Sequence, residues 1–88
     1  MFDDETPIAW TALPQGIQVV GFDGADIGKV EEVLGDRDED IFHGLLLRRA
    51  GDGERVELPA THVKKMTARH VVTDLDGAQA GALQAYRR

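Results

Sequence analysis

Three carboxylates at alternate positions, Asp36, Asp38 and Asp40, have the residue type and spacing of a metal site. The same spacing opens the calcium loop of EF-hands, which also needs a glycine at its sixth position and a bidentate glutamate at its twelfth. This sequence has Ile41 and Leu47 at those positions. The segment is therefore predicted to be a solvated acidic turn with no assigned metal, and weak, nonspecific cation binding stays open.

The imidazoles and hydroxyls give no pattern typical of catalysis. The three histidines, His43, His62 and His70, match no local metal-ligand spacing. Thr61 precedes His62, but adjacency in sequence does not create the geometry of a nucleophile and its base. The chain contains neither serine nor cysteine. We therefore expect no enzyme, no catalytic residues and no cofactor. The alternative is a small-ligand or divalent-metal-binding barrel that uses the acidic loop and the histidines.

Composition restricts the remaining classes of function. A chain of 88 residues forms one small domain. Its net charge of -6 argues against nucleic acid or an anionic membrane as a partner. The sequence has no apolar run long enough to cross a bilayer, and its acidic start does not resemble a secretory signal. A cytoplasmic protein with no membrane insertion is expected.

Residues 1–13 are predicted to form an arm ahead of a domain at residues 14–88. The arm is polar and contains proline, but it carries three large apolar residues, Phe2, Ile8 and Trp10, which we predict as interaction residues. Trp10 has two readings: it folds back to plug an open barrel end, or it anchors an interface, where tryptophan is enriched. Both hold if the arm crosses to a second subunit.

Short β-prone segments separated by glycine turns recur through the rest of the chain and indicate a small antiparallel barrel, whose closure would remove exposed edges. Asp23 and Gly24 form a turn dipeptide typical of hairpins. Apolar residues at every third position from Ile27 indicate a bulged strand, with Gly28 at the bend. Pro59 ends the fourth strand. The expected strands are 18–22, 26–34, 41–48, 55–59, 65–67 and 70–73, followed by a helix from Asp74 or Asp76 to Tyr86.

Four segments in this order resemble PRC-barrel domains: 16–33 with its Asp-Gly-x-x-Ile-Gly-x-Val core, 42–47, 55–63 and 71–75. The resemblance implies a compact barrel-like sheet with a short C-terminal helix. The family includes the cytoplasmic domain of the photosynthetic reaction-centre H subunit and the C-terminal domain of a ribosome maturation factor, and its recurring theme is docking to another protein. This chain has neither the membrane helix nor the second domain of those two proteins, so neither role transfers.

Together these observations predict a mainly all-β, PRC-barrel-like sheet of about five to six short strands with a C-terminal helix. The predicted function is a non-enzymatic protein-interaction module that self-associates as a homo-oligomer, most simply a dimer. The one local basic cluster, at residues 62–69, has no interleaved aromatic side chain, so no nucleic-acid partner is expected.

Overall fold

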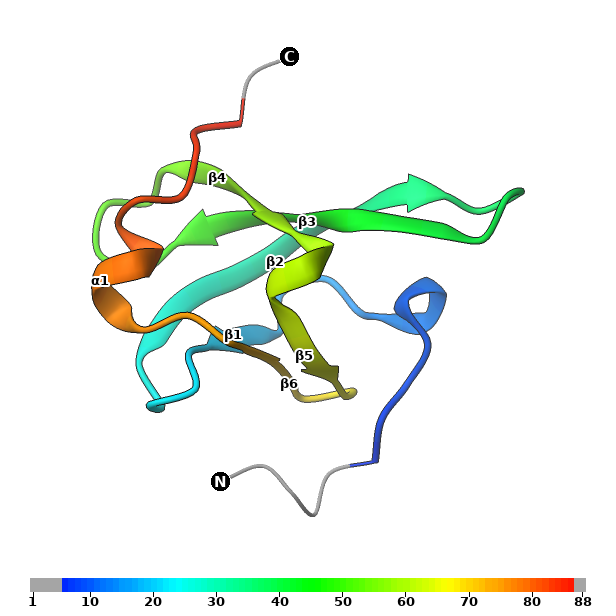
Figure 1. The fold of residues 1–88 in the computed structure, drawn as a ribbon, viewed down its shortest axis with the longest axis horizontal. Coiled ribbons are helices and arrows are strands. Elements are labelled where there is room, and N and C mark those ends of the chain that lie inside the picture. Colours follow the sequence, from blue (N-terminus) through cyan, green and yellow to red (C-terminus); the bar gives the residue numbers. More distant parts are fainter. Residues whose placement is uncertain (1–5, 87–88) are drawn as a thin grey trace.

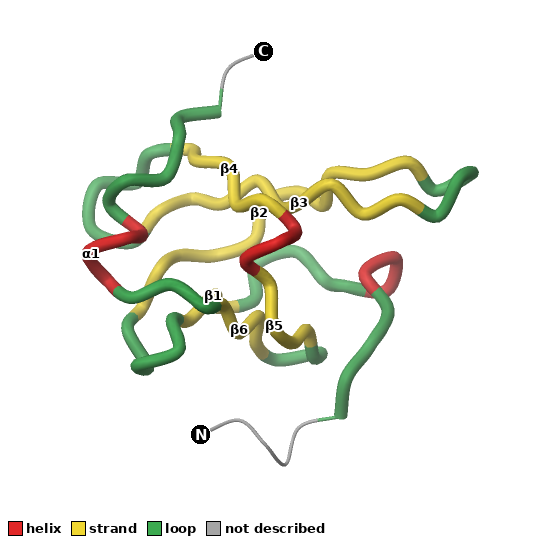
Figure 2. Tube along the Cα trace, in the orientation of Figure 1, coloured by secondary structure: helices red, strands yellow, loops and turns green. Residues whose placement is uncertain are grey.

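A computed structural model describes residues 6–86 of the chain. Six strands form a single sheet in the order β4-β3-β2-β1-β6-β5 (Figures 1 and 2). The mainly all-β fold is thus confirmed. The elements are η1 Trp10–Ala12, β1 Gln18–Val20, β2 Asp26–Asp36, β3 Ile41–Arg49, β4 Arg55–Pro59, η2 Ala60–His62, β5 Val63–Met66, β6 His70–Thr73 and α1 Gly77–Ala80.

The sheet curls but does not close, which corrects the expectation of a sealed barrel. β4 and β5 lie at opposite ends of the strand order and do not pair with each other. Only the three residues of η2, directly after Pro59, connect them, so the curl brings the two edges near one another (Figure 1). β1 and β6 also run parallel, whereas the other neighbours are antiparallel. The two halves of the sheet therefore join through one parallel pair.

The N-terminal segment covers the β5 edge. The Ile8 amide donates to the Met66 carbonyl at 2.9 Å. Pro7 forms an antiparallel bridge with Thr67, just beyond the end of β5. The backbone groups at the end of β5 thereby gain partners within the same chain.

The segment after α1 covers the β4 edge in the same way. The Glu57 amide donates to the Gln84 carbonyl at 3.0 Å, and the Tyr86 amide donates to the Arg55 carbonyl at 2.9 Å. This pairing explains why the helix is shorter than expected. The predicted helix to Tyr86 is wrong beyond Ala80, because the following residues extend along β4.

The start of α1 agrees with the sequence. Asp76 caps the helix: its carboxylate accepts from the Gln79 amide at 2.7 Å, and the Gln79 side chain accepts from the Asp76 amide at 2.9 Å. This reciprocal pair satisfies two amide groups that a helix start leaves without partners. A single turn of helix is thereby defined at the end of the sheet.

The core lies on the inner face of the curled sheet. Val56 and Leu58 of β4 point inward, as their alternation predicted. Leu46, between two core leucines, is also buried although it belongs to the opposite face. The core residues are Leu13, Val19, Ile27, Val30, Leu45, Leu47, Val56, Leu58, Val71, Leu75 and Ala80.

β2 is a bulged strand, as the spacing from Ile27 predicted. Its register shifts near Gly28 against β1 and between Val30 and Glu32 against β3. A methyl group on Gly28 would lie 2.4 Å from the Arg48 carbonyl oxygen, so the two backbones approach closely there.

Candidate functional site

The outer half of the β2–β3 hairpin projects beyond the rest of the sheet (Figure 1). β1 pairs with β2 only as far as Lys29, and β4 pairs with β3 only from Gly44 onward. Residues 35–42, named here the hairpin tip, therefore have no flanking strand. Within the turn, the Asp36 carboxylate accepts from the backbone amides of Asp38 and Glu39 at 3.0 and 3.2 Å.

Trp10 packs on this hairpin tip. Its ring stacks on Phe42, with centroids 5.7 Å apart and planes inclined by 22°. Its indole Nε1 donates to Asp40 Oδ1 at 3.2 Å, and the Arg37 guanidinium lies 5.7 Å from the ring centroid. A methyl group on Gly35 would be 3.0 Å from the indole ring, so glycine leaves room for the tryptophan. One aromatic side chain thus contacts both sides of the hairpin.

The other predicted interaction residues have different positions. Ile8 is half-buried against the core. Phe2 lies outside the described residues. The structure adds Ile41, which the interaction prediction did not include: it lies at the hairpin tip with 46% of its surface exposed. Its signal in the sequence is the placement of a β-branched residue directly after an acidic turn.

Of the predicted turn residues, Asp23 and Gly24 lie between β1 and β2. Gly24 has a φ of 85°, and the Asp23 carboxylate accepts from the Ala25 amide at 3.0 Å. Pro59 is the last residue of β4 and precedes η2. These residues shape the backbone and contact neither Trp10 nor the hairpin tip in any recorded interaction.

The acidic triplet does not form a cation cage in the structure. Asp36 binds turn amides and Asp40 binds the indole, so oxygens at two of the three positions already have donors. Within residues 6–86, no three histidine, aspartate or glutamate side chains gather in an arrangement that would hold a metal ion. The residues that sequence spacing grouped as metal ligands instead support the turn and hold the arm.

One histidine has an acidic neighbour. His62 Nδ1 and Asp74 Oδ1 are 2.9 Å apart, and the Asp74 amide donates to the His62 carbonyl at 3.0 Å. The pair holds η2 against the segment that follows β6. Thr61 is exposed, and no recorded interaction joins its hydroxyl to this pair. The contact therefore serves to fasten two chain segments.

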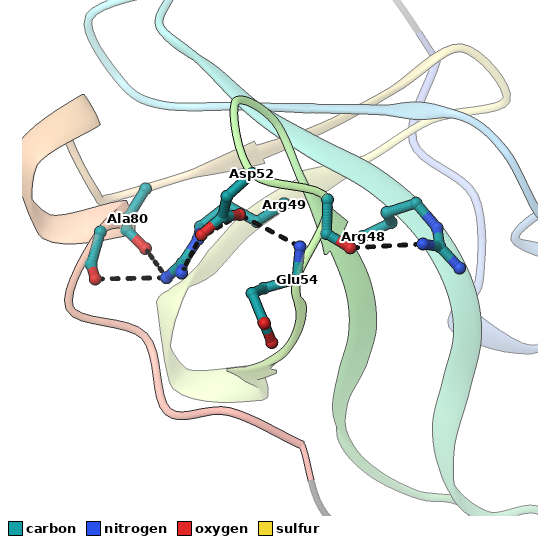
Figure 3. Close-up of polar contacts among 7 residues, drawn as sticks. Arg48, Arg49, Asp52, Glu54 and Ala80 are labelled. Atoms are coloured by element: carbon teal, nitrogen blue, oxygen red, sulfur yellow. Dashed lines mark hydrogen bonds and ion pairs between the residues drawn. The ribbon is translucent and has the colours of Figure 1, made fainter.

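Sequence reasoning missed Arg49, which links three parts of the chain (Figure 3). Its guanidinium makes two bonds to the Asp52 carboxylate, at 3.2 and 2.6 Å. It also donates to the carbonyls of Ala80 and Gly81 at 3.4 and 3.2 Å. Arg49 thus satisfies carbonyls at the end of α1 that have no helical partner. The signal was available as an arginine three residues before an aspartate across a glycine turn.

The Arg49–Asp52 pair alters the titration of both groups. The hydrogen bond from Arg49, followed by the bond from the Glu54 amide, lowers the pKa of Asp52 from 3.8 to about 2. The hydrogen bond to Asp52 raises the pKa of Arg49. A depression of about 400 Å³ beside this pair has Asp26 as its third polar side chain. Because Arg49 and Asp52 are bound to each other, they do not present a free acid and base to a substrate.

A second cluster was also missed, on the outer face of the sheet. Arg48 and Arg55 are directly opposite one another on β3 and β4. Glu31 bridges them, with its two oxygens 2.7 Å from Arg48 and 3.1 Å from Arg55. The carboxylate therefore offsets the repulsion between two neighbouring cations.

Residues 12–80 match the PRC-barrel domain family, so the chain belongs to this family. Such domains are generally non-catalytic, and membership suggests a small interaction module. A comparison with curated proteins gave no match. Among the described residues, no helix has the length and apolar character to cross a membrane.

Proposed function

We propose that this PRC-barrel protein is a non-catalytic interaction module whose partner is a second copy of the same chain. The association surface is the hairpin tip together with the arm, which denotes residues 6–13 from here on. One observation carries the proposal: an exposed Ile41 and the stacked pair of Trp10 and Phe42 occupy a hairpin that projects beyond the sheet. Apolar and aromatic groups in such a position are typical anchors of protein interfaces.

Charge gives the proposal a second testable property. Each copy carries a net charge of -6, so two copies repel one another at long range. The contact must therefore gain its free energy from apolar burial at the hairpin tip. Added salt screens the repulsion, and the dimer should become stronger between low and physiological ionic strength.

The surface can be tested with two matched substitutions. Ile41 and Phe22 are the large apolar residues most exposed to solvent, at 46% and 63%, and they belong to different turns of the sheet. Ile41→Lys should raise the dimer dissociation constant at least tenfold in sedimentation equilibrium, since it places a charge in an apolar contact. Phe22→Lys should leave the constant unchanged.

Two results would contradict the proposal. A wild-type chain that remains monomeric up to millimolar concentration would exclude self-association. A dimer that Phe22→Lys disrupts and Ile41→Lys does not would place the interface at the other hairpin turn. Both variants change exposed positions, so circular dichroism should show the same folded sheet for each.

A further inference from the structure

We infer that two copies of the chain exchange their arms, so that the arm of each copy occupies the β5 edge and the hairpin tip of the other. This inference rests on the proposed self-association and specifies its geometry. It does not require a new surface. The body already has a binding site whose occupant is visible, and a second copy presents the same occupant.

The arm contacts the body at two separate places. At one, Ile8 donates a backbone hydrogen bond to Met66 and extends the sheet by a short bridge. At the other, Trp10 contacts Phe42 and Asp40 at the hairpin tip. These are the features of an extended peptide bound by strand addition with one aromatic anchor. An arm supplied by another copy would make the same contacts.

The segment between the arm and β1 is suited to act as a hinge. Gln15 and Gly16 form a turn that reverses the chain before β1. Gly16 has a φ of 83°, and a side chain added there would meet no atom within 4 Å. The Gly16 amide donates to the Val30 carbonyl at 2.7 Å, which fixes the body side of the turn. Only backbone rotation within this turn is needed to direct the arm away from its own body.

The residue before the hinge sets the size of the exchanged unit. Leu13 belongs to the buried core and directly precedes Pro14, which restricts the backbone between the arm and the turn. Leu13 therefore moves with the arm, and the equivalent leucine of the second copy fills its place. Exchange of this kind preserves every contact of the closed monomer and changes only the hinge.

The first test mixes two variants that are each defective. Trp10→Ala removes the anchor from the arm, and Phe42→Ala removes its stacking partner from the body. In either pure variant every arm site is damaged, but an exchanged heterodimer contains one intact pair of Trp10 and Phe42. Sedimentation velocity should show at least a tenfold larger dimer fraction for the equimolar mixture than for either variant alone, with wild type as reference.

The second test leaves the contacts intact and changes the hinge. Gly16→Val strains the closed turn, because a β-branched residue disfavours positive φ, whereas Gly16→Asn tolerates it. If exchange extends the hinge, valine should raise the dimer association constant about fivefold or more, as expected from about 1 kcal/mol of relieved strain. Asparagine should leave the constant near that of wild type.

The outcomes separate this inference from the proposed function. A wild-type dimer with no recovery in the mixture, and with the same constant for Gly16→Val and Gly16→Asn, would overturn arm exchange while self-association stands. If wild type and all variants stay monomeric, both proposals fail. If Phe42→Ala or Trp10→Ala does not fold, the hinge variants alone decide, because neither alters a packed side chain.

Discussion

The Trp10 indole donates a hydrogen bond to the carboxylate of Asp40, thirty positions later in the chain. Asp40 has a φ of 55°, a left-handed conformation that side chains other than those of asparagine and aspartate rarely adopt. The same residue thus shapes the turn of the hairpin and receives the arm. This double role explains why an aspartate at this position is useful without any bound metal.

We predict an ordered series of effects for substitutions of Asp40. Asp40→Asn keeps an acceptor and tolerates the backbone conformation, so the free energy of unfolding should change little. Asp40→Gly keeps only the conformation, and Asp40→Ala loses both properties. Alanine should lower the free energy of unfolding by about 1–2 kcal/mol, and glycine should lie between. Urea denaturation of the three variants checks the order, and equal losses in all three would contradict it.

Stacking between Trp10 and Phe42 should be measurable as a coupling energy. Trp10→Ala should destabilise the monomer by about 1–3 kcal/mol, because the side chain is half-buried and loses both its stacking and its hydrogen bond. A double-mutant cycle with Phe42→Ala should give a coupling of about 0.5–1.5 kcal/mol. Additive losses would show that the two rings do not interact in solution. Trp10→Phe is the control that keeps an aromatic ring without the indole donor.

A methyl group should be tolerated at one glycine and harmful at another. Gly28→Ala places its methyl 2.4 Å from a backbone oxygen of Arg48, which must move. It should cost about 1–3 kcal/mol, as in other overpacked sites. Gly77→Ala meets only the Ala25 methyl at 3.5 Å, and in α1 it should be neutral or stabilising by up to about 1 kcal/mol. Thermal denaturation of both variants provides the comparison, and a stable Gly28→Ala protein would exclude the close backbone approach.

The bond between Arg49 and Asp52 should make stability depend on acid pH. The pKa of Asp52 is about 2 in the folded protein and 3.8 as its ordinary value, so the unfolded chain binds the proton more tightly. The contribution is therefore complete above about pH 4 and is lost as the pH falls toward 2. Asp52→Asn should show a shallower loss of melting temperature across this window than wild type. Parallel curves for the two proteins would mean that the pair does not form.

The sequence predicted those features that depend on local residue pattern. The bulge near Gly28 and the inward positions of Val56 and Leu58 follow from spacing along one strand. The C-terminal helix was overestimated because helical spacing does not reveal that Tyr86 has a partner on β4. Competition between distant segments is absent from any local pattern.

Prediction of the candidate site was divided in the same way. Trp10 could be singled out because an aromatic residue on a polar arm is unusual. Its partners Phe42 and Asp40 could not be named, since only the fold brings the arm to the hairpin tip. Arg49 was missed because its role depends on α1 carbonyls about thirty residues away. Side chains that fasten distant segments carry no distinctive neighbourhood in sequence.

The two terminal segments that lie along β4 and β5 also have a consequence for the protein's fate after damage. Proteolytic removal of residues 82–86 would leave the amide of Glu57 and the carbonyl of Arg55 unpaired beside an apolar β4. Such a strand is a template for intermolecular β-sheet growth. Nicking by a protease should therefore turn a well-behaved protein into an aggregating one before the core itself unfolds.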